Sequence, residues 1–178
     1  MPIENERKYV LRLNVSEGVF HDAADGVEDI EQVYLISGKK QSLRCRKITR
    51  VKDHGKIELI YNMTFKQEVG KKVVEIETDI DARDYKLLKK SATAVLQKTR
   101  YRVDDWEVDF FKADGKTYFV LAEIEMPENQ KKPHSIPTLI NENLVHVVKR
   151  GDKRFTSKRL CDVKHAQQLI SSLKGKVK

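Results

Sequence analysis

The chain has 178 residues, of which 35% are charged and 39% hydrophobic, and its formal net charge is +8. The length predicts one domain over residues 1–178, ending in a basic tail at 174–178, and the composition excludes a disordered chain. It has no apolar run of membrane-spanning length, no signal-peptide pattern after Met1 and no metal-type cysteine spacing. We expect a cytoplasmic protein with no membrane partner, and the positive charge favours an anionic one.

The N-terminal segment 3–11 carries charged side chains at every second position, namely Glu4, Glu6 and Lys8. In an extended strand these three side chains share one face. Two carboxylates and an ammonium are costly to bury without partners. The pattern therefore indicates a face directed at a charged ligand, with carboxylates for a divalent cation and a lysine for phosphate.

The same alternation continues along the chain. Strands are expected at 43–48, 57–67, 73–80, 97–103, 106–111 and 118–126. Their same-face polar positions are Arg44 and Arg46; Asn62, Thr64 and Lys66; Glu75 and Glu77; Lys98, Arg100 and Arg102; Glu107 and Asp109; Glu123 and Glu125. A half-exposed antiparallel sheet also alternates polar and apolar residues. Because directly opposed like charges destabilise a plain sheet, the pattern favours a closed barrel with a charged lumen.

Other segments have helix, turn or loop signals. Helices are expected at 16–24, at 81–93 with Asp81 as N-cap, and at 160–173. Hairpin turns are expected at 53–56, 70–72 and 113–116. A strand is expected near 33–35 and a further one at 145–148, with a loop at 128–137.

These motifs, in this order, resemble those of the CYTH superfamily, the triphosphate tunnel metalloenzymes. The resemblance rests on Glu4-x-Glu6-x-Lys8, Arg44-x-Arg46, Thr64-x-Lys66, Glu75-x-Glu77, Lys98-Thr99-Arg100, Glu107-Val108-Asp109 and Glu123-Ile124-Glu125. It implies an α+β, mainly β fold: a closed eight-stranded antiparallel β-barrel with helices packed outside. It also implies binding of a small anionic triphosphate with Mg²⁺ or Mn²⁺.

The resemblance implies a role for each motif position. Catalytic roles fall to Glu4, Lys8 and Lys98. The phosphate-binding residues would be Lys8, Arg44, Arg46, Lys66, Lys98, Arg100 and Arg154. The metal ligands would be Glu4, Glu6, Asp109, Glu123 and Glu125, with Glu75 and Glu77 acting behind them. The final motif departs from the family pattern, because Phe155 and Ser157 replace a tyrosine and an asparagine.

The function that this resemblance implies is metal-dependent hydrolysis of a triphosphate, with inorganic triphosphate as substrate. Two alternatives are a class IV adenylyl cyclase that makes cyclic AMP from ATP, and a non-catalytic module that binds polyphosphate, a nucleotide or an RNA 5′-triphosphate end. Apart from such an RNA end, no nucleic acid is expected, and the protein is expected to be a monomer or homodimer. Most aromatic residues fall on the face opposite the charged positions, so base recognition should be poor. The exceptions are Phe111 and Phe119.

Overall fold

The computed structural model describes residues 5–38, 40–52, 55–70 and 72–174, which form two compact units. Unit 1 comprises Glu28–Gln97, and unit 2 comprises the described parts of Glu4–Val27 and Lys98–Lys178. The strands are β1 (Glu6–Leu11), β2 (Gly26–Ser37), β3 (Gln41–Val51), β4 (Ile57–Val69), β5 (Lys72–Asp79), β6 (Ala94–Val103), β7 (Trp106–Ala113), β8 (Lys116–Glu125) and β9 (Leu144–Val147). The helices are α1 (Glu17–Ala23), α2 (Ala82–Lys89), α3 (Thr138–Glu142), α4 (Ser157–Leu160) and α5 (Val163–Lys174), with a 3₁₀ turn η2 (Lys153–Phe155).

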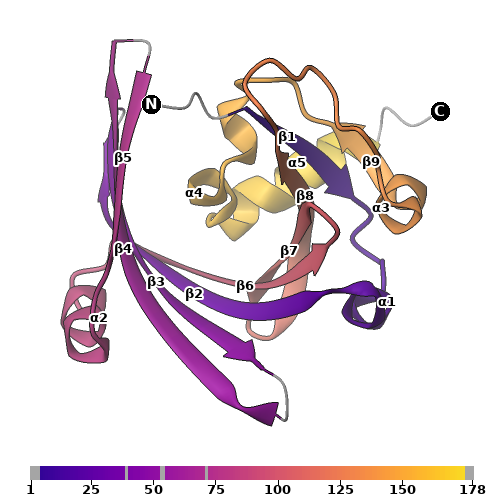
Figure 1. Cartoon of the computed structure of the whole chain (residues 1–178). Helices are drawn as coiled ribbons and strands as arrows, with labels where there is room; N and C mark the ends of the chain where they lie inside the picture. The colour runs from indigo at the N-terminus through magenta and orange to yellow at the C-terminus, as the bar shows by residue number, and fades with distance from the viewer. Residues whose placement is uncertain (1–4, 39, 53–54, 71, 175–178) are drawn as a thin grey trace. The chain divides into compact units, whose positions relative to one another are not determined.

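The strands confirm an α+β, mainly β class. Their hydrogen-bonded order is β5-β4-β3-β2-β6-β7-β8-β1-β9, and β2 and β6 each run from one unit into the other (Figure 1). The sheet has nine strands where eight were expected. Within the described part of the chain no ladder joins β5 to β9, so these residues give an open order.

Unit 1 is an antiparallel meander from β2 to β5 with α2 packed on one face. The alternation of β-branched and aromatic residues with polar ones along β4 favours such a half-buried strand. Asp81 caps α2 by accepting hydrogen bonds from the backbone N–H groups of Arg83 at 2.7 Å and Asp84 at 2.8 Å. Beneath the helix, Tyr85 packs with Val33 and Cys45. This arrangement confirms that Cys45 lies on the face away from Arg44 and Arg46.

Unit 2 contains the larger core, on one face of β6, β7, β8 and β1. Trp106 stacks on Tyr9 with ring centroids 5.0 Å apart, which confirms Trp106 as a core residue. Helix α1 contributes Phe20 and helix α3 contributes Ile140 to the same core. The turn between β7 and β8 uses Asp114 and Gly115, both at positive φ, as expected for a tight hairpin.

Several element boundaries differ from the expectations. The expected helix at 160–173 is two helices, because the chain turns at Cys161 and Asp162 before α5 begins. The Asp162 side chain accepts a hydrogen bond from the backbone N–H of His165 at 3.0 Å, which caps the new helix. Helix α3 and η2 were not predicted, and β2 is far longer than the expected 33–35. No helix in the described ranges is long and apolar enough to cross a membrane.

Candidate functional site

In unit 2 the charged positions of β1, β7 and β8 lie in register on one face. Glu6 is the cross-strand partner of Glu125, and Lys8 is the partner of Glu123. On its other side Glu123 is paired with Glu107. The Lys8 ammonium also contacts the Glu6 carboxylate of its own strand at 3.0 Å. The alternation predicted for these strands is therefore confirmed.

Exposure falls along β1 on this face, from the Glu6 side chain at 44% to the Lys8 side chain at 14%. In the row of Lys8, the Glu123 and Glu107 side chains are 15% and 35% exposed. One row further along the strands every residue is fully buried: Val10, Leu121 and Asp109. The face is thus open to solvent at one end and sealed at the other.

Aromatic packing produces the sealed end. Phe111 and Phe119 are direct cross-strand partners, both fully buried, with ring centroids 6.1 Å apart. Phe155 of η2 packs against Phe119 at 6.5 Å and is also buried. Phe111 and Phe119 do share the parity of the acidic pairs, as expected, but they act there as core residues.

Asp109 lies at the centre of three charge-assisted hydrogen bonds. Arg100 donates from Nε to Oδ1 at 2.7 Å and from Nη2 to Oδ2 at 2.8 Å, and Lys98 donates from Nζ to Oδ2. The side chains of Lys98 and Asp109 are 1% and 0% exposed. The Lys98 ammonium also lies 5.7 Å from the centre of the Phe111 ring.

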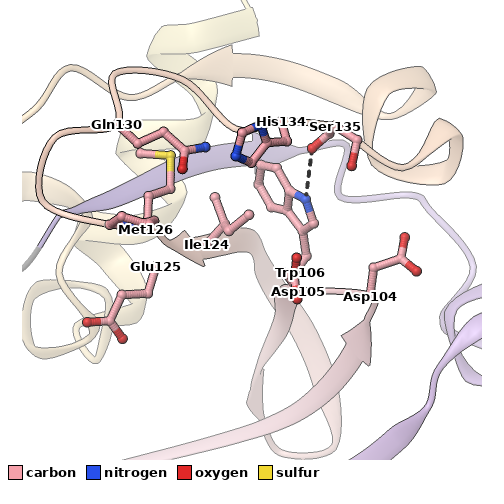
Figure 2. Close-up of a pocket in the computed structure, with 10 residues that line it drawn as sticks. Asp104, Asp105, Trp106, Ile124, Glu125, Met126, Gln130, His134 and Ser135 are labelled. Carbon is pink, nitrogen blue, oxygen red and sulfur yellow. Dashed lines mark hydrogen bonds between the residues drawn. The ribbon is translucent and has the colours of Figure 1, made fainter.

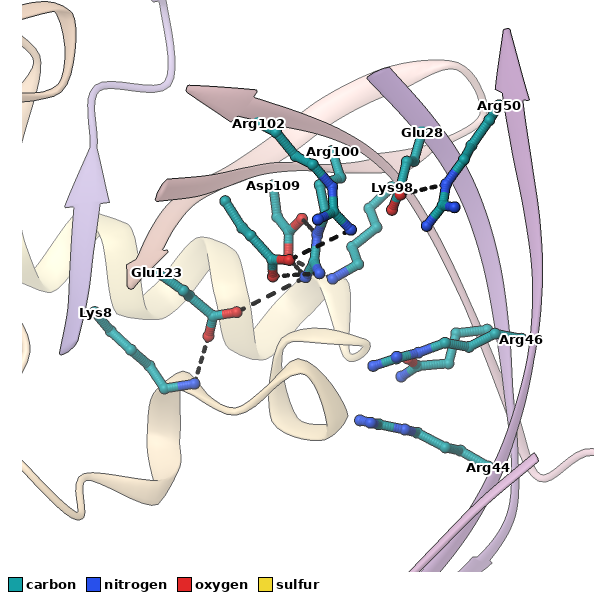
Figure 3. Close-up of polar contacts among 12 residues, drawn as sticks. Lys8, Glu28, Arg44, Arg46, Arg50, Lys98, Arg100, Arg102, Asp109 and Glu123 are labelled. Atoms are coloured by element: carbon teal, nitrogen blue, oxygen red, sulfur yellow. Dashed lines mark hydrogen bonds and ion pairs between the residues drawn. The ribbon is translucent and has the colours of Figure 1, made fainter. Parts of the chain in front are cut away.

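These contacts extend into one chain of ion pairs, which we call the unit 2 ion network (Figure 3). Its members are Lys98, Asp109, Arg100, Glu107, Arg102, Glu123, Lys8 and Glu6. Arg100 is its branch point, because its guanidinium contacts Glu107, Asp109 and, at 4.0 Å, Glu123. Cations and carboxylates alternate along the chain, so each charge is compensated.

The protonation states follow from these contacts. Burial alone would raise the pKa of Asp109, but the charges of Arg100 and Lys98 hold that pKa well below its ordinary value. Burial likewise opposes the charged form of Lys8, and the carboxylates of Glu123 and Glu6 outweigh it and raise the pKa of Lys8. Both groups are charged near neutral pH.

Two cavities adjoin the open end of the face in unit 2. The larger, of about 580 Å³, is lined by Glu6, Arg102, Asp104, Asp105, Trp106, Glu107, Glu123, Ile124 and Glu125. The smaller, of about 90 Å³, lies beside Trp106, whose indole N–H donates to the Ser135 carbonyl at 3.3 Å (Figure 2). Carboxylates dominate the larger cavity, whereas Asp109 is absent from its lining.

Unit 1 carries a second charged face, on the side of its sheet opposite α2. Its rows run across β2 to β5: Gln32, Arg46, Asn62 and Asp79; then Tyr34, Arg44, Thr64 and Glu77; then Ser42, Lys66 and Glu75. Arg46 donates from Nε to Gln32 Oε1 at 2.8 Å. Glu75 contacts Lys66 at 3.0 Å and Arg44 at 3.8 Å. Glu77 accepts a hydrogen bond from the Thr64 hydroxyl at 2.8 Å.

Arg44 has a donor that this face leaves unused. Its Nε is buried and has no hydrogen-bond partner among the described residues. The guanidinium groups of Arg44 and Arg46 extend from β3 in the same direction (Figure 3). A buried donor without a partner costs about 1–3 kcal/mol, so it favours an acceptor supplied by a ligand.

The alternation along β2 and β3 continues into charged residues that were not predicted from the sequence as part of the site. Ile30, Ile48 and Ile60 form an apolar row beside the row of Arg46. Beyond it, Arg50 donates to the buried Glu28 at 2.6 Å. The signal was present in the sequence, because these residues have the parity of Arg44 and Arg46, but it depends on knowing how far β2 extends.

Some predicted residues lie elsewhere. Glu4 lies outside the described residues. Arg154 is not part of the unit 2 ion network; its exposed guanidinium pairs with Asp152 at 2.7 Å. Glu125 is exposed, beside Glu6 at the open end of the face.

The fit of a divalent cation can be judged from the donors. Within the described ranges, no three His, Cys, Asp or Glu side chains are placed to hold a metal ion. The chemistry of the donors does suit Mg²⁺ or Mn²⁺, because carboxylate oxygens are the ligands these cations prefer. Glu6 and Glu125 are directly opposed like charges, an arrangement that a bound cation would stabilise.

Comparison with known proteins gives structural neighbours only. No family model matches the chain, and no curated protein matches it. The PH1012 protein of Pyrococcus horikoshii OT3 is similar at 22% identity and a TM-score of 0.42, over 67% of this chain and 78% of that one. A conserved hypothetical protein of Pyrococcus furiosus is similar at 18% identity and a TM-score of 0.45, over 97% of this chain and 90% of that one.

Proposed function

We propose that this protein is a metal-dependent hydrolase of triphosphate compounds, with inorganic triphosphate as its preferred substrate. The proposal includes closure of the sheet into a barrel, as the CYTH resemblance implies. The observation that carries it is the buried, unpartnered Nε of Arg44, on the same face as Arg46 and Lys66. An arginine fork with a free buried donor suits the non-bridging oxygens of a phosphate chain.

The proposed phosphate-binding groups are Arg44, Arg46 and Lys66 of unit 1, and Lys8, Lys98 and Arg100 of unit 2. Most of these cations contact carboxylates: Arg44 and Lys66 contact Glu75, Lys8 and Arg100 contact Glu123, and Lys98 contacts Asp109. When a triphosphate binds, its oxygens would replace some of the carboxylates in these ion pairs. Catalysis of phosphoryl transfer needs little covalent chemistry from the protein, so positioning and charge neutralisation would supply most of the rate.

The proposed cation ligands are Glu6, Glu123 and Glu125, together with Glu4, which lies outside the described residues. A bound Mg²⁺ or Mn²⁺ would neutralise charge on the phosphate oxygens and lower the pKa of the attacking water. Lys8 contacts both Glu6 and Glu123, which supports a role in orienting the two carboxylates and in binding phosphate beside them.

The preference for a substrate without a base follows from the aromatic side chains. Tyr34, Phe111 and Phe119 have the parity of the charged faces, but they are 3%, 0% and 0% exposed. They offer no free ring surface on which a base could stack. A small inorganic polyanion makes full use of the charged groups without that contact.

The test is a comparison of specificity constants for inorganic triphosphate, ATP and thiamine triphosphate, each with Mg²⁺, Mn²⁺ or EDTA. We expect the highest kcat/KM with inorganic triphosphate and no turnover in EDTA. Formation of cyclic AMP and pyrophosphate from ATP would instead establish a cyclase. Binding of every triphosphate with no cleavage under either metal would establish a binding module.

A further inference from the structure

The two carboxylates of β7 occupy different environments, although they share one face of the strand. Glu107 is 35% exposed and lines the cavity of about 580 Å³. Asp109 is 0% exposed and does not line it. Two positions along one strand therefore separate a carboxylate at the open end from one in the interior.

The register explains this difference. Glu107 is paired with Glu123, which is paired with Lys8, so its row consists of charged residues. Asp109 is paired with Leu121, which is paired with Val10, so on the side of β8 and β1 its neighbours are apolar and fully buried. On that side, packed apolar side chains cover Asp109.

The hydrogen bonds of Asp109 also argue against coordination of a metal ion by its carboxylate. Both oxygens of Asp109 accept charge-assisted bonds, from Arg100 at 2.7 and 2.8 Å and from Lys98. Coordination of a metal ion would replace these bonds and remove the buried carboxylate that Lys98 and Arg100 share, which is unfavourable. Glu107 contacts Arg100 and Arg102 from the cavity side, where water and ions have access.

We propose that these two carboxylates have different tasks: Asp109 is a positioning residue that holds Lys98 and Arg100, and Glu107 is the carboxylate that β7 presents to the divalent cation. This inference rests on the proposed function for the presence of that cation. It replaces Asp109 by Glu107 in the ligand set that the CYTH resemblance implies. Arg100 then links the two, because its guanidinium contacts both carboxylates.

The first test is Mn²⁺ binding without substrate, measured from the loss of the free-ion electron paramagnetic resonance signal. Glu107→Gln should weaken Mn²⁺ binding tenfold or more, whereas Asp109→Asn should leave it within about threefold. Asp109→Asn should instead raise the KM for inorganic triphosphate about tenfold, because two cations lose their orientation. Weaker Mn²⁺ binding in Asp109→Asn than in Glu107→Gln, or no effect of Glu107→Gln, would overturn the proposal.

Because Asp109→Asn removes a buried negative charge between two cations, that variant can fail to fold, so a second test uses the native protein. The ¹⁵Nε–H resonance of Arg100 reports its bond to Asp109, and it should stay in place and exchange slowly when Mg²⁺ and inorganic triphosphate are added. A large shift with fast exchange would mean that the cation takes Asp109. A protein that shows the expected binding and resonance but hydrolyses no triphosphate contradicts the proposed function and leaves this assignment intact.

Discussion

Glu6 and Glu125 are direct cross-strand partners, so two carboxylates of neighbouring strands meet at the open end of the charged face in unit 2. Lys8 contacts Glu6 from the next same-face position of its own strand. Like charges in this position destabilise a sheet by a few tenths to about 1 kcal/mol. The divalent cation of the proposed function would offset this repulsion.

Removal of one of these charges should abolish metal-dependent activity. Glu6→Gln changes charge without changing volume, and the side chain is 44% exposed, so the fold should be retained. We expect loss of turnover with Mn²⁺ and an unchanged unfolding transition by circular dichroism. Glu128→Gln, in an exposed loop, is the matched control and should keep full activity. Turnover by Glu6→Gln that also persists in EDTA would show that no metal is held there.

The unused donor of Arg44 predicts opposite effects on binding and on stability. Arg44→Lys keeps the charge but removes the buried Nε and the fork. Inorganic triphosphate should bind about tenfold or more weakly, since a charged hydrogen bond contributes about 1.5–3 kcal/mol. The free energy of unfolding should not fall, because the substitution also removes a buried N–H group that has no hydrogen-bond partner among the described residues.

Calorimetric titration and denaturant unfolding measure these two effects. Arg83→Lys on α2, where Arg83 is exposed, controls for a general change of charge and should alter neither. Equal triphosphate affinity in native protein and Arg44→Lys would mean that Arg44 does not contact phosphate. Arg46→Lys should also weaken the binding of inorganic triphosphate, although Arg46 Nε already donates a hydrogen bond to Gln32.

The acid stability of unit 2 should depend on Glu17. Burial raises the pKa of Glu17, but hydrogen bonds from Lys112 and Thr117 outweigh it, so the net pKa is below the ordinary value. Its contribution is therefore present above the unfolded-state pKa of about 4.3 and is lost as pH falls through the lower folded-state value. Glu17→Gln should cost about 1–2 kcal/mol at pH 7, and this difference should shrink below about pH 4.

Denaturant unfolding at a series of pH values measures this difference directly. Asp22→Asn, on the same helix with an 87% exposed side chain, is the control and should change stability by under about 0.5 kcal/mol. A Glu17→Gln difference that stays constant from pH 7 to pH 3 would show that ionised Glu17 does not stabilise the fold.

Phe155 should not tolerate a tyrosine, the residue that the CYTH pattern has at this position. Its ring is fully buried between Phe119 and His146, at 6.5 and 5.8 Å. Phe155→Tyr would bury a hydroxyl and should cost about 1–3 kcal/mol of unfolding free energy. Phe65→Tyr, at a partly exposed position, should cost less than about 0.5 kcal/mol. Unchanged stability of Phe155→Tyr would mean that a polar partner lies within reach.

The period-two pattern predicted most strands and the faces of their charged residues, because alternation is a local property of extended chain. It placed Lys8, Arg44 and Glu123 correctly on their faces. It could not predict that Asp109 is buried while Glu107 is open. That difference depends on Leu121 and Val10, which are brought beside Asp109 only by the register of three strands.

The helical boundaries show a second limit of local reasoning. A continuous helical stripe predicted one helix from Leu160, but Asp162 offers its side chain as a cap and divides the segment. The exposed position of Arg154 could not be predicted from the sequence pattern either. Its exposed pairing with Asp152 follows from η2, a turn without sequence periodicity.

The proposed hydrolysis can be observed by ³¹P nuclear magnetic resonance of inorganic triphosphate incubated with the purified protein and Mg²⁺. We expect the triphosphate signals to disappear while orthophosphate and pyrophosphate appear in equal amounts, and Glu6→Gln and EDTA each to prevent this. Triphosphate signals that persist unchanged with native protein under both Mg²⁺ and Mn²⁺ would show that the protein is not a triphosphatase.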